Sequence, residues 1–513
     1  MHWEGPRAPP PTAVGSSNAL GRGAAMLGRR RTVVSRSMFR TVELRGMLRR
    51  LATAASAAMF PVSLAVITFA AGLLFAQNEW FPATTVAEAQ KTLTAVMLQL
   101  FRPFAAEQFK DFSGGAIKDI QKNRIVVRAP APPAAADEHF LISGGLHQYL
   151  EYCPDAGCIA VEFSRAGDLV RAYPYRPEQL EANRIVSLPY EQVLFDFAEN
   201  AYPWGVLKLP GGHLIATFNQ WGTFPYGGGI ARLRPDGSVV WFRHDYSHHW
   251  PRQLVGGEIA VPATRVAGSR ISAPLMTGVD VHLDCEGKIA EDIVRIIDPD
   301  GRVIQEIPVL QAFLRSPYRG MLVDLKMPCF PLHLNYVASV TPGIQSLYND
   351  VSPDDLVISL RDVNAFAILG RRDERLKHLF TGTFLRQHGV QPLGQSATML
   401  IFDNHGADWR AGPSRLLAYD LADRSERTLL PNAGAPGVGI SSDIKGTISV
   451  SHDQARVIVT SSADGRAYEI GIADGKVLTV FNNIHDLSRV PAAGEARLSA
   501  AARFFFHTVE YVR

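Results

Sequence analysis

From about Ile125 onward, the chain repeats one pattern of hydrophobic and polar positions. A run of β-branched and aromatic residues is followed by a glycine-containing turn and then by a second such run, with turns at 210–212, 235–237 and 299–301. Hairpins at steady spacing, with few helical stretches between them, predict an all-β repeat architecture. Roughly 380 residues, at about 40 to 60 per four-stranded unit, correspond to six to eight blades of a β-propeller. Two stacked β-sandwich domains are the alternative, although no linker in mid-chain separates them.

Two apolar patterns precede this repeat. No charged residue interrupts the chain from Leu51 to Ala76, and roughly 20 apolar residues are enough to cross a bilayer. We therefore expect a transmembrane helix over 51–76, with a cleaved signal peptide as the alternative. Apolar residues then recur every three or four positions from Val86 to Phe104, which predicts an amphipathic stalk helix within 77–112. Such a stalk could also support a homodimer.

Charge changes the picture mainly at the N-terminus. The whole chain has 52 Lys and Arg against 49 Asp and Glu, so no global field indicates a nucleic-acid partner. Residues 1–50, however, form a basic arm in which Glu4 and Glu43 are the only acidic residues. Basic residues ahead of an apolar segment stay on the cytoplasmic side. We expect a single-pass membrane protein with a cytoplasmic N-terminus and a propeller over 113–513 that is periplasmic or otherwise extracytoplasmic.

The four cysteines are compatible with disulfides in an exported domain. Cys153 and Cys158 flank Pro-Asp-Ala-Gly, a turn-forming sequence that could close a small ring. Cys285 and Cys329 either pair or remain buried thiols, and four unpaired core cysteines are equally compatible with the sequence. No Cys-x-x-Cys pair suggests zinc.

Candidate chemistry lies at the ends of four β-type runs. These carry His249 in Ser-His-His-Trp, His333 in Pro-Leu-His-Leu-Asn, Arg361 in Val-Ile-Ser-Leu-Arg and His388 in Leu-Arg-Gln-His-Gly. A lone histidine in a β protein is more often structural, but a propeller directs side chains from several blades into one axial funnel. Three imidazoles and a guanidinium suit the transfer of an anionic group.

A metal site is not expected. His244 and His248 have a His-x₃-His spacing, which serves a metal best on a helix, whereas this stretch is expected to end a strand.

The four blocks in this order, followed by Ile-Phe-Asp-Asn-His-Gly and Ser-Arg-Leu-Leu-Ala-Tyr, resemble the arylsulfate sulfotransferase family over 204–482. The resemblance implies a six-bladed propeller that moves a sulfuryl group from an aryl sulfate to a phenol without a nucleotide donor or other cofactor. It implies that His388 is the nucleophile that is transiently sulfurylated. His249 matches the first active-site histidine. The residues that match those around the transferred group are His333, Asn335 and Arg361.

One position departs from the family pattern. The family usually has His-Asp at the first block, whereas Trp250 follows His249 here. Neighbouring His248 is therefore an alternative for that role. A propeller that kept the fold but serves as a ligand-binding or scaffold protein is the alternative function.

The proposed chemistry sets further expectations. A neutral His388 attacks sulfur through one ring nitrogen, so its other nitrogen should be held by a hydrogen bond. His249 or His333 would give a proton to the departing phenolate. Asn404 either contacts the site or forms a turn after a strand, together with Asp403. Several aromatic residues either wall an acceptor pocket or belong to the core: Trp204, Trp221, Trp241, Tyr226 and Phe366.

Overall fold

The computed structural model describes residues 125–127 and 137–513 with internal gaps. The gaps are 145–148, 150–151, 189–200, 221–227, 269, 277–278, 285–287, 324, 326–327, 406–412, 433–438, 443–444, 463–464, 487–500 and 504–505. The chain divides into two compact units, Met1–Gln90 and Lys91–Arg513, and the described residues all belong to the second. The predicted arm, transmembrane helix and stalk helix lie outside them. Within the described residues, no helix combines the length and apolar character that a membrane span needs.

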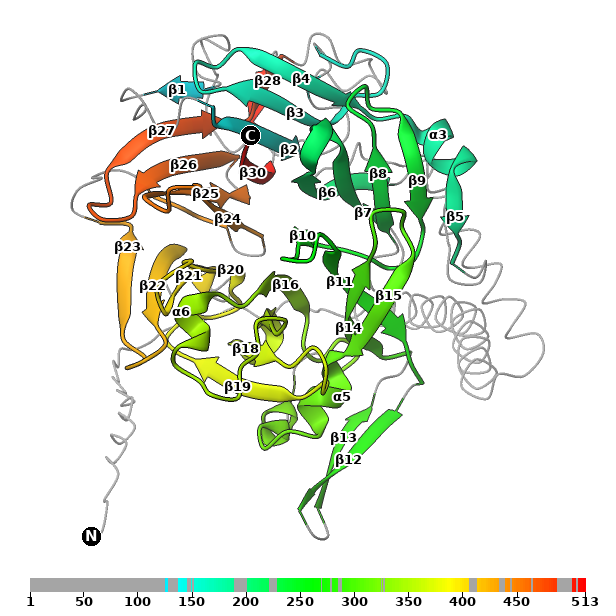
Figure 1. Cartoon of the computed structure of the whole chain (residues 1–513), viewed down its shortest axis with the longest axis vertical. Helices are drawn as coiled ribbons and strands as arrows, with labels where there is room; N and C mark the ends of the chain where they lie inside the picture. The colour runs from blue at the N-terminus through cyan, green and yellow to red at the C-terminus, as the bar shows by residue number, and fades with distance from the viewer. Residues whose placement is uncertain are drawn as a thin grey trace, which may run out of the picture. The chain divides into compact units, whose positions relative to one another are not determined.

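Most described residues form six sheets, antiparallel except for one added parallel strand, arranged as the blades of a β-propeller (Figure 1). This confirms the all-β prediction and the number of blades that the resemblance implied. The hairpins predicted from the repeated pattern are present, for example at the 235–237 and 299–301 turns. Alternation along each strand places one set of apolar side chains on each face of a blade, and both faces pack against neighbouring blades.

Blades 1 to 3 come from the first part of the propeller. Blade 1 contains β2 (His139–Gly144), β3 (Cys158–Ser164), β4 (Leu169–Pro174) and the C-terminal β30 (Phe506–Val512). Blade 2 contains β6 (Ala201–Lys208), β7 (Leu214–Gln220), β8 (Gly229–Leu233) and β9 (Val239–Arg243), with β5 (Arg184–Val186) added at its edge. Blade 3 contains β10 (Arg252–Gln253), β11 (Ile259–Val266), β14 (Ala290–Ile297) and β15 (Val303–Pro308). A separate hairpin, β12 (Arg270–Met276) and β13 (Val279–Asp284), is inserted in blade 3.

Blades 4 to 6 follow the same order. Blade 4 contains β16 (Leu334–Ser339), β17 (Leu356–Leu360), β18 (Ala365–Leu369) and β19 (Leu376–Thr381). Blade 5 contains β20 (His388–Pro392), β21 (Thr398–Asp403), β22 (Arg415–Asp420) and β23 (Glu426–Leu430). Blade 6 contains β24 (Thr447–Val450), β25 (Arg456–Ser461), β26 (Arg466–Gly471) and β27 (Val477–Asn482). A further two-stranded sheet joins β28 (Ile484–Asp486) and β29 (Ala501–Arg503).

Strands from both ends of the described chain close the ring. The C-terminal β30 pairs with β2 in register Val512↔His139, which completes blade 1. The early strand β1 (Ile125–Val127) pairs with β27 at the edge of blade 6. Because each pairing joins a strand from the beginning of the described chain to one from its end, both hold blades 6 and 1 together and contribute to the stability of the whole domain.

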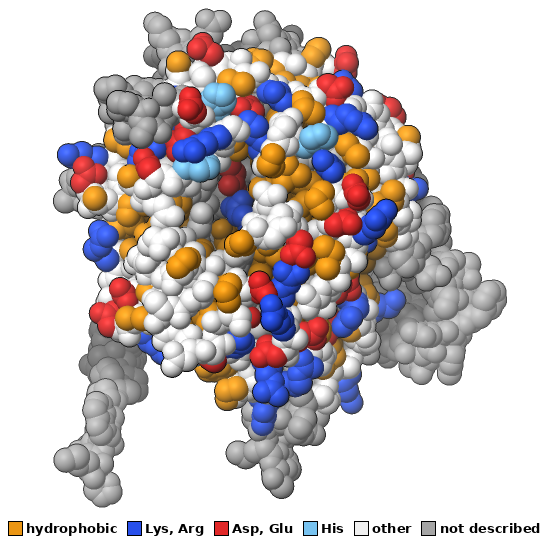
Figure 2. Space-filling view, viewed as in Figure 1, with side chains coloured by type: hydrophobic (Ala, Val, Ile, Leu, Met, Phe, Trp, Pro, Cys, Tyr) orange, Lys and Arg blue, Asp and Glu red, His pale blue; other side chains and the backbone are white. Residues whose placement is uncertain are grey.

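Six hydrophobic clusters fill the spaces between neighbouring blades in the described part of the chain. Each cluster combines side chains of two adjacent blades, for example Val357 and Phe366 of blade 4 with Val390 and Tyr419 of blade 5. The remaining clusters join the other neighbouring pairs in the same way. Figure 2 shows acidic and basic side chains intermixed on one face, in agreement with the small net charge.

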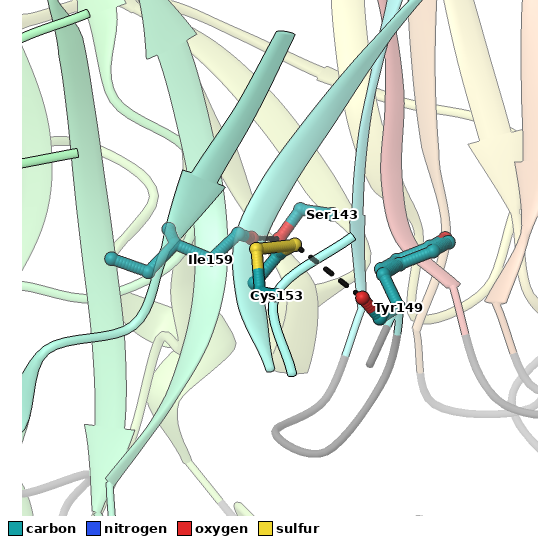
Figure 3. Close-up of a disulfide and its surroundings, with 5 residues drawn as sticks. Ser143, Tyr149, Cys153 and Ile159 are labelled. Atoms are coloured by element: carbon teal, nitrogen blue, oxygen red, sulfur yellow. Dashed lines mark hydrogen bonds between the residues drawn. A yellow bond between two sulfur atoms is a disulfide. The ribbon is translucent and has the colours of Figure 1, made fainter. Parts of the chain in front are cut away.

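The predicted Cys153–Cys158 disulfide is present next to blade 1 (Figure 3). The close-up shows Ser143 donating to the carbonyl oxygen of Ile159 at 2.9 Å. The approach of Cys158 Sγ to the Tyr149 carbonyl oxygen, 3.7 Å, is a contact rather than a hydrogen bond, because a disulfide sulfur carries no proton. Cys329 is also disulfide-bonded, whereas Cys285 lies outside the described residues.

Candidate functional site

Blade topology explains why residues far apart in sequence meet at one end of the axis. In an antiparallel blade, the start of the first strand lies beside the end of the second. His333 precedes β16 and Arg361 follows β17, and the Arg361 backbone N–H donates to the His333 carbonyl oxygen at 3.2 Å. His388 begins β20 and Asn404 follows β21. His249 lies in the segment that leads from blade 2 into β10.

The structure brings the three predicted histidines into direct proximity. The ring centroids of His249 and His333 are 5.7 Å apart, those of His249 and His388 6.2 Å, and those of His333 and His388 6.5 Å. One nitrogen from each ring lies within 4.8 Å of the other two. His249 and His388 are each 1 % exposed. The predicted cluster therefore exists as a buried group supplied by blades 3, 4 and 5.

Asn404 determines which nitrogen of His388 is available. The Asn404 amide nitrogen donates to the carbonyl oxygens of Ser442 and Lys445, the latter at 2.8 Å. Its oxygen must therefore face His388 Nδ1, 2.7 Å away. A carbonyl oxygen can only accept, so Nδ1 carries the proton and Nε2 carries the lone pair. The expected hydrogen bond to the second nitrogen of His388 is present, and Asn404 contacts the nucleophile candidate rather than only ending a strand.

The segment containing His248 and His249 is held in a constrained conformation. His249 has φ +56°, a left-handed conformation that costs a non-glycine residue about 1–3 kcal/mol. Thr217 donates to the His249 carbonyl oxygen. A Cβ at Gly205 would collide with that oxygen and with Trp250 Cα, so this position requires glycine. The Nδ1 atoms of His248 and His249 share a hydrogen bond, so His248 contacts the site through His249.

His333 and Arg361 are oriented by two aspartate side chains. His333 also has a left-handed backbone, at φ +55°. Asp292 accepts from the backbone N–H groups of Leu334, at 2.8 Å, and His333, at 3.2 Å. Arg361 Nη1 donates to Asp362 at 2.7 Å, whereas the buried Arg361 Nε has no hydrogen-bond partner among the described residues. One edge of this guanidinium is thus fixed while another donor remains available.

Burial keeps the histidines neutral. It lowers the pKa of His388 to about 3, with a further contribution from the Arg361 charge. Burial likewise lowers the pKa of His249 and of His333 well below the ordinary value, and the surrounding histidines and Arg361 add to both shifts. For His248, burial and the charge of Arg295 lower the pKa to about 3. Neutral imidazoles are competent nucleophiles but poor proton donors.

The same three imidazoles are the group of described residues with the spacing to hold a metal ion. Neutral imidazole is a good ligand for zinc and copper. The Arg361 guanidinium acts electrostatically on all three rings, however, and a fixed cation beside the cluster disfavours a second cation and favours an anion. His244, which has the His-x₃-His spacing with His248, contacts Gln220 at 3.0 Å.

The remaining predicted residues have different places. Asn335 is fully buried and donates to the Gln387 carbonyl oxygen at 2.8 Å, next to His388, while its own side-chain oxygen has no partner among the described residues. Asp403 accepts from Leu385 N–H and from Arg415, so it stabilises the loop before His388. Trp204 borders the site, with its ring 5.0 Å from that of His249.

The other aromatic candidates do not reach the site. Trp241 and Phe366 belong to clusters between blades, and residues 221 and 226 lie outside the described residues.

Sequence reasoning missed three contributors to the site. Asp362 holds Arg361, and Gln387 donates to the Ala365 carbonyl oxygen at 2.7 Å, which ties the His388 segment to blade 4. Lys445 is 9 % exposed and lies two residues before β24, at the position in blade 6 that corresponds to the histidines of blades 4 and 5. The blade repeat was the signal that could have identified Lys445, once the strands had been aligned.

No protein-family profile matches the chain, and no curated protein matches it. Solved structures that are similar to it include a protein of unknown function from Bacteroides caccae, at 12% identity over 57% of this chain and 93% of that one, with a TM-score of 0.28. A functionally unknown protein from Desulfotomaculum acetoxidans is 9% identical over 67% and 82% of the two chains, with a TM-score of 0.33. A catalytically inactive variant of virginiamycin B lyase from Staphylococcus aureus, with quinupristin, is 10% identical over 55% and 70%, with a TM-score of 0.30. Likeness at this level carries no argument about function, which must come from the site itself.

Proposed function

We propose that this protein is an aryl-sulfate sulfotransferase that passes a sulfuryl group through His388. The observation that carries the proposal is the hydrogen bond from His388 Nδ1 to Asn404. That bond fixes the tautomer in which Nε2 has a lone pair, on a ring that burial keeps neutral. A preoriented neutral imidazole is the form that can attack an electrophilic centre and later leave it.

The surroundings of His388 fit an anionic group in transfer. Sulfuryl transfer resembles phosphoryl transfer, in which a loose transition state spreads charge over the equatorial oxygens. Arg361 supplies a buried guanidinium whose Nε is available to those oxygens. His249 and His333 supply further polar ring atoms close to His388. An arginine in this role accelerates a transfer by about 10³ to 10⁵-fold.

The reaction then has two steps. His388 Nε2 attacks sulfur in an aryl sulfate, and the bond from sulfur to the aryl oxygen breaks, so the aryl oxygen leaves with the electron pair as a phenolate and His388 becomes sulfurylated. A second phenol loses its proton and attacks the same sulfur through its oxygen, the bond between sulfur and nitrogen breaks, and the electron pair returns to His388 Nε2. Neither step requires a cofactor.

The proposal extends to the location of the enzyme. Residues 51–76 would anchor the chain in the bilayer, followed by a stalk over 77–112, with the N-terminus in the cytoplasm and the propeller in the periplasm or another extracytoplasmic space. The stalk could also join two copies. The substrates would be small molecules, an aryl sulfate and a phenol, and the near-balanced charge of the chain gives no reason to expect nucleic acid.

Mass spectrometry of the full-length chain in detergent tests the proposal. After incubation with 4-nitrophenyl sulfate, the intact protein should gain one sulfuryl group on the peptide that contains His388. Added phenol should remove it. Absence of an adduct and of nitrophenol release across many aryl sulfates would overturn the proposal in favour of a ligand-binding or scaffold propeller.

A further inference from the structure

The departing phenolate needs a proton that the histidines are poorly suited to give. An ordinary phenol has a pKa of about 10, so its anion gains strongly from protonation as the bond to sulfur breaks. Burial and neighbouring charges keep His249 and His333 neutral, so neither ring carries the extra proton that an acid must supply. The sequence predicts that one of these two histidines is the proton donor, and their low pKa values argue against that role.

Each of five neighbouring blades presents one side chain at the same end of the axis. Trp204 comes from β6 of blade 2, and His249, His333 and His388 come from the starts of blades 3, 4 and 5. Lys445, just before β24, occupies this place in blade 6. Its Nζ lies 5.2 Å from the centroid of the Trp204 ring, which itself lies 5.0 Å from the His249 ring. Lys445 therefore lies between blade 5, which carries His388, and Trp204, which borders His249.

The Lys445 backbone is tied to the nucleophile through one residue. The Lys445 carbonyl oxygen accepts from the Asn404 amide, and the same amide group holds His388. After burial and Arg361, the charge of Lys445 also contributes to the low pKa of His388. A buried ammonium on an aromatic ring, next to the nucleophile, is therefore part of the site.

We propose that Lys445 is the acid–base group for the phenol oxygen, with the aryl ring of the substrate beside Trp204. This inference rests on the proposed sulfuryl transfer and names the group that handles its proton. An alkylammonium carries a proton that it can give to a departing phenolate, and the amine that remains can take a proton from an incoming phenol. A positioned group that gives or takes this proton in the transition state accelerates the step by about 10² to 10⁴-fold.

The proton balance closes over the two steps. In the first, the electron pair of the breaking bond goes to the aryl oxygen, which takes a proton from the Lys445 ammonium and leaves as a phenol. In the second, the neutral Lys445 amine takes the proton of the incoming phenol, whose oxygen attacks sulfur, and the electron pair of the nitrogen–sulfur bond returns to His388 Nε2. The net change is the transfer of one sulfuryl group from the donor aryl sulfate to the acceptor phenol, which leaves the donor as a free phenol.

The test is the dependence of the sulfurylation rate on the leaving group, measured with the full-length chain. Lys445→Met removes the proton and the charge while keeping the length of the side chain. Loss of a general acid costs about 10² to 10⁴-fold for a poor leaving group. We expect a loss of that size with phenyl sulfate, but less than about threefold with 4-nitrophenyl sulfate, whose anion needs no proton. Lys476→Met is the matched control, because Lys476 is exposed and its side chain pairs with Asp474.

The outcomes separate this inference from the proposed function. A steeper leaving-group dependence in Lys445→Met, and none in Lys476→Met, supports Lys445 as the acid. An equal loss with both donors, or no loss with either, overturns its role while leaving the His388 adduct in place. If wild-type His388 forms no adduct with any donor, the proposed function itself has failed. Lys445→Arg adds a check. Arginine keeps the positive charge but gives up its proton poorly, so this variant should still transfer more slowly than the wild type with phenyl sulfate.

Discussion

Two regions of the propeller bury charged and polar side chains. One is the contact between blade 6 and blade 1, where these side chains are paired, and the other is the histidine cluster at the axial ends of blades 3 to 5, where several polar atoms are not. Between blades 6 and 1, Arg456 donates to Glu138 at 2.7 Å and to Glu469 at 3.1 Å. Arg165 donates to Glu469 at 2.7 Å, and Tyr511 donates to the same carboxylate. We call these residues the ring-closing network. Each of its charged side chains is paired with a side chain of opposite charge, and Arg456 Nε is the one atom named here without a hydrogen-bond partner among the described residues.

The axial cluster instead keeps like groups together and some polar atoms without partners. Three neutral imidazoles surround one another, Arg361 Nε and Asn335 Oδ1 have no partner among the described residues, and two of the histidines have left-handed backbones. Unsatisfied buried donors and strained backbone lower stability, each by about 1–3 kcal/mol. The ring-closing network therefore stabilises the domain, whereas the axial cluster lowers stability and leaves polar atoms for the ligand that we propose.

Removal of His388 should have the largest effect. His388→Ala removes the proposed nucleophile, so turnover should fall by about 10⁴-fold or more, while the free energy of unfolding should change little. Initial rates with 4-nitrophenyl sulfate and urea denaturation measure the two quantities. His378→Ala, a histidine of blade 4 that pairs with Asp350 at the surface, is the control. Normal turnover in His388→Ala would contradict the mechanism.

The reverse pattern is expected in the ring-closing network. Glu469→Gln leaves the buried Arg456 and Arg165 with one carboxylate fewer, which should lower the free energy of unfolding by about 3 kcal/mol. Activity per folded molecule should remain unchanged. Asp474→Asn, which removes an exposed pair with Lys476 in the same blade, should cost less than about 1 kcal/mol. If both substitutions lowered the free energy of unfolding equally, the buried ion pairs would contribute no more to stability than the exposed one.

Asn404 should have an intermediate effect on rate. Asn404→Leu removes the acceptor from His388 Nδ1, so the ring can adopt either tautomer and orientation, and the rate should fall about 100-fold. Nitrogen-15 NMR should show a proton on Nδ1 of His388 in the wild type and a mixture in the variant. Asn183→Leu, which removes a hydrogen bond to Gln179 far from the axis, should leave the spectrum unchanged. An unaltered His388 signal in Asn404→Leu would refute the positioning role.

A change of pH should have the smallest effect on the rate of His388 sulfurylation. An ordinary imidazole with a pKa of 6.5 would lose about tenfold of its neutral form between pH 7.5 and 5.5. Because burial lowers the pKa of His388 to about 3, the rate per folded molecule should change less than about twofold. Single-turnover labelling measures it, and a tenfold decrease would contradict the burial of a neutral nucleophile.

Stability should follow pH differently from rate. The unfolded histidines gain protons below about pH 6.5 while His248 and His388 stay neutral in the folded state down to about pH 3. Each such histidine therefore favours unfolding by up to about 1.4 kcal/mol per pH unit in this window. Urea titrations at each pH give the folded fraction needed to correct the rates.

Much of the fold was predictable because the hairpins are local. The turns at 235–237 and 299–301 and the apolar runs around them appear where the pattern placed them. The Cys153–Cys158 disulfide could be predicted for the same reason, since five residues of chain bring the sulfurs together. Lys445 as the proposed proton donor was not predictable from the sequence, because the low pKa values that make His249 and His333 poor donors arise from burial among residues of other blades.

By itself, the sequence determined the repeated strands, their turns, and the short motifs that carry His249, His333, Arg361 and His388, because these depend on residues close together in the chain. Only the tertiary structure decided that three imidazoles lie within reach of one another, that Asn404 fixes the tautomer of His388, and that Lys445 of the last blade lies over Trp204. The physical reason is ring closure. Pairing of β30 with β2 and of β1 with β27 brings the last blade beside the first, and contacts across the axis depend on that closed geometry.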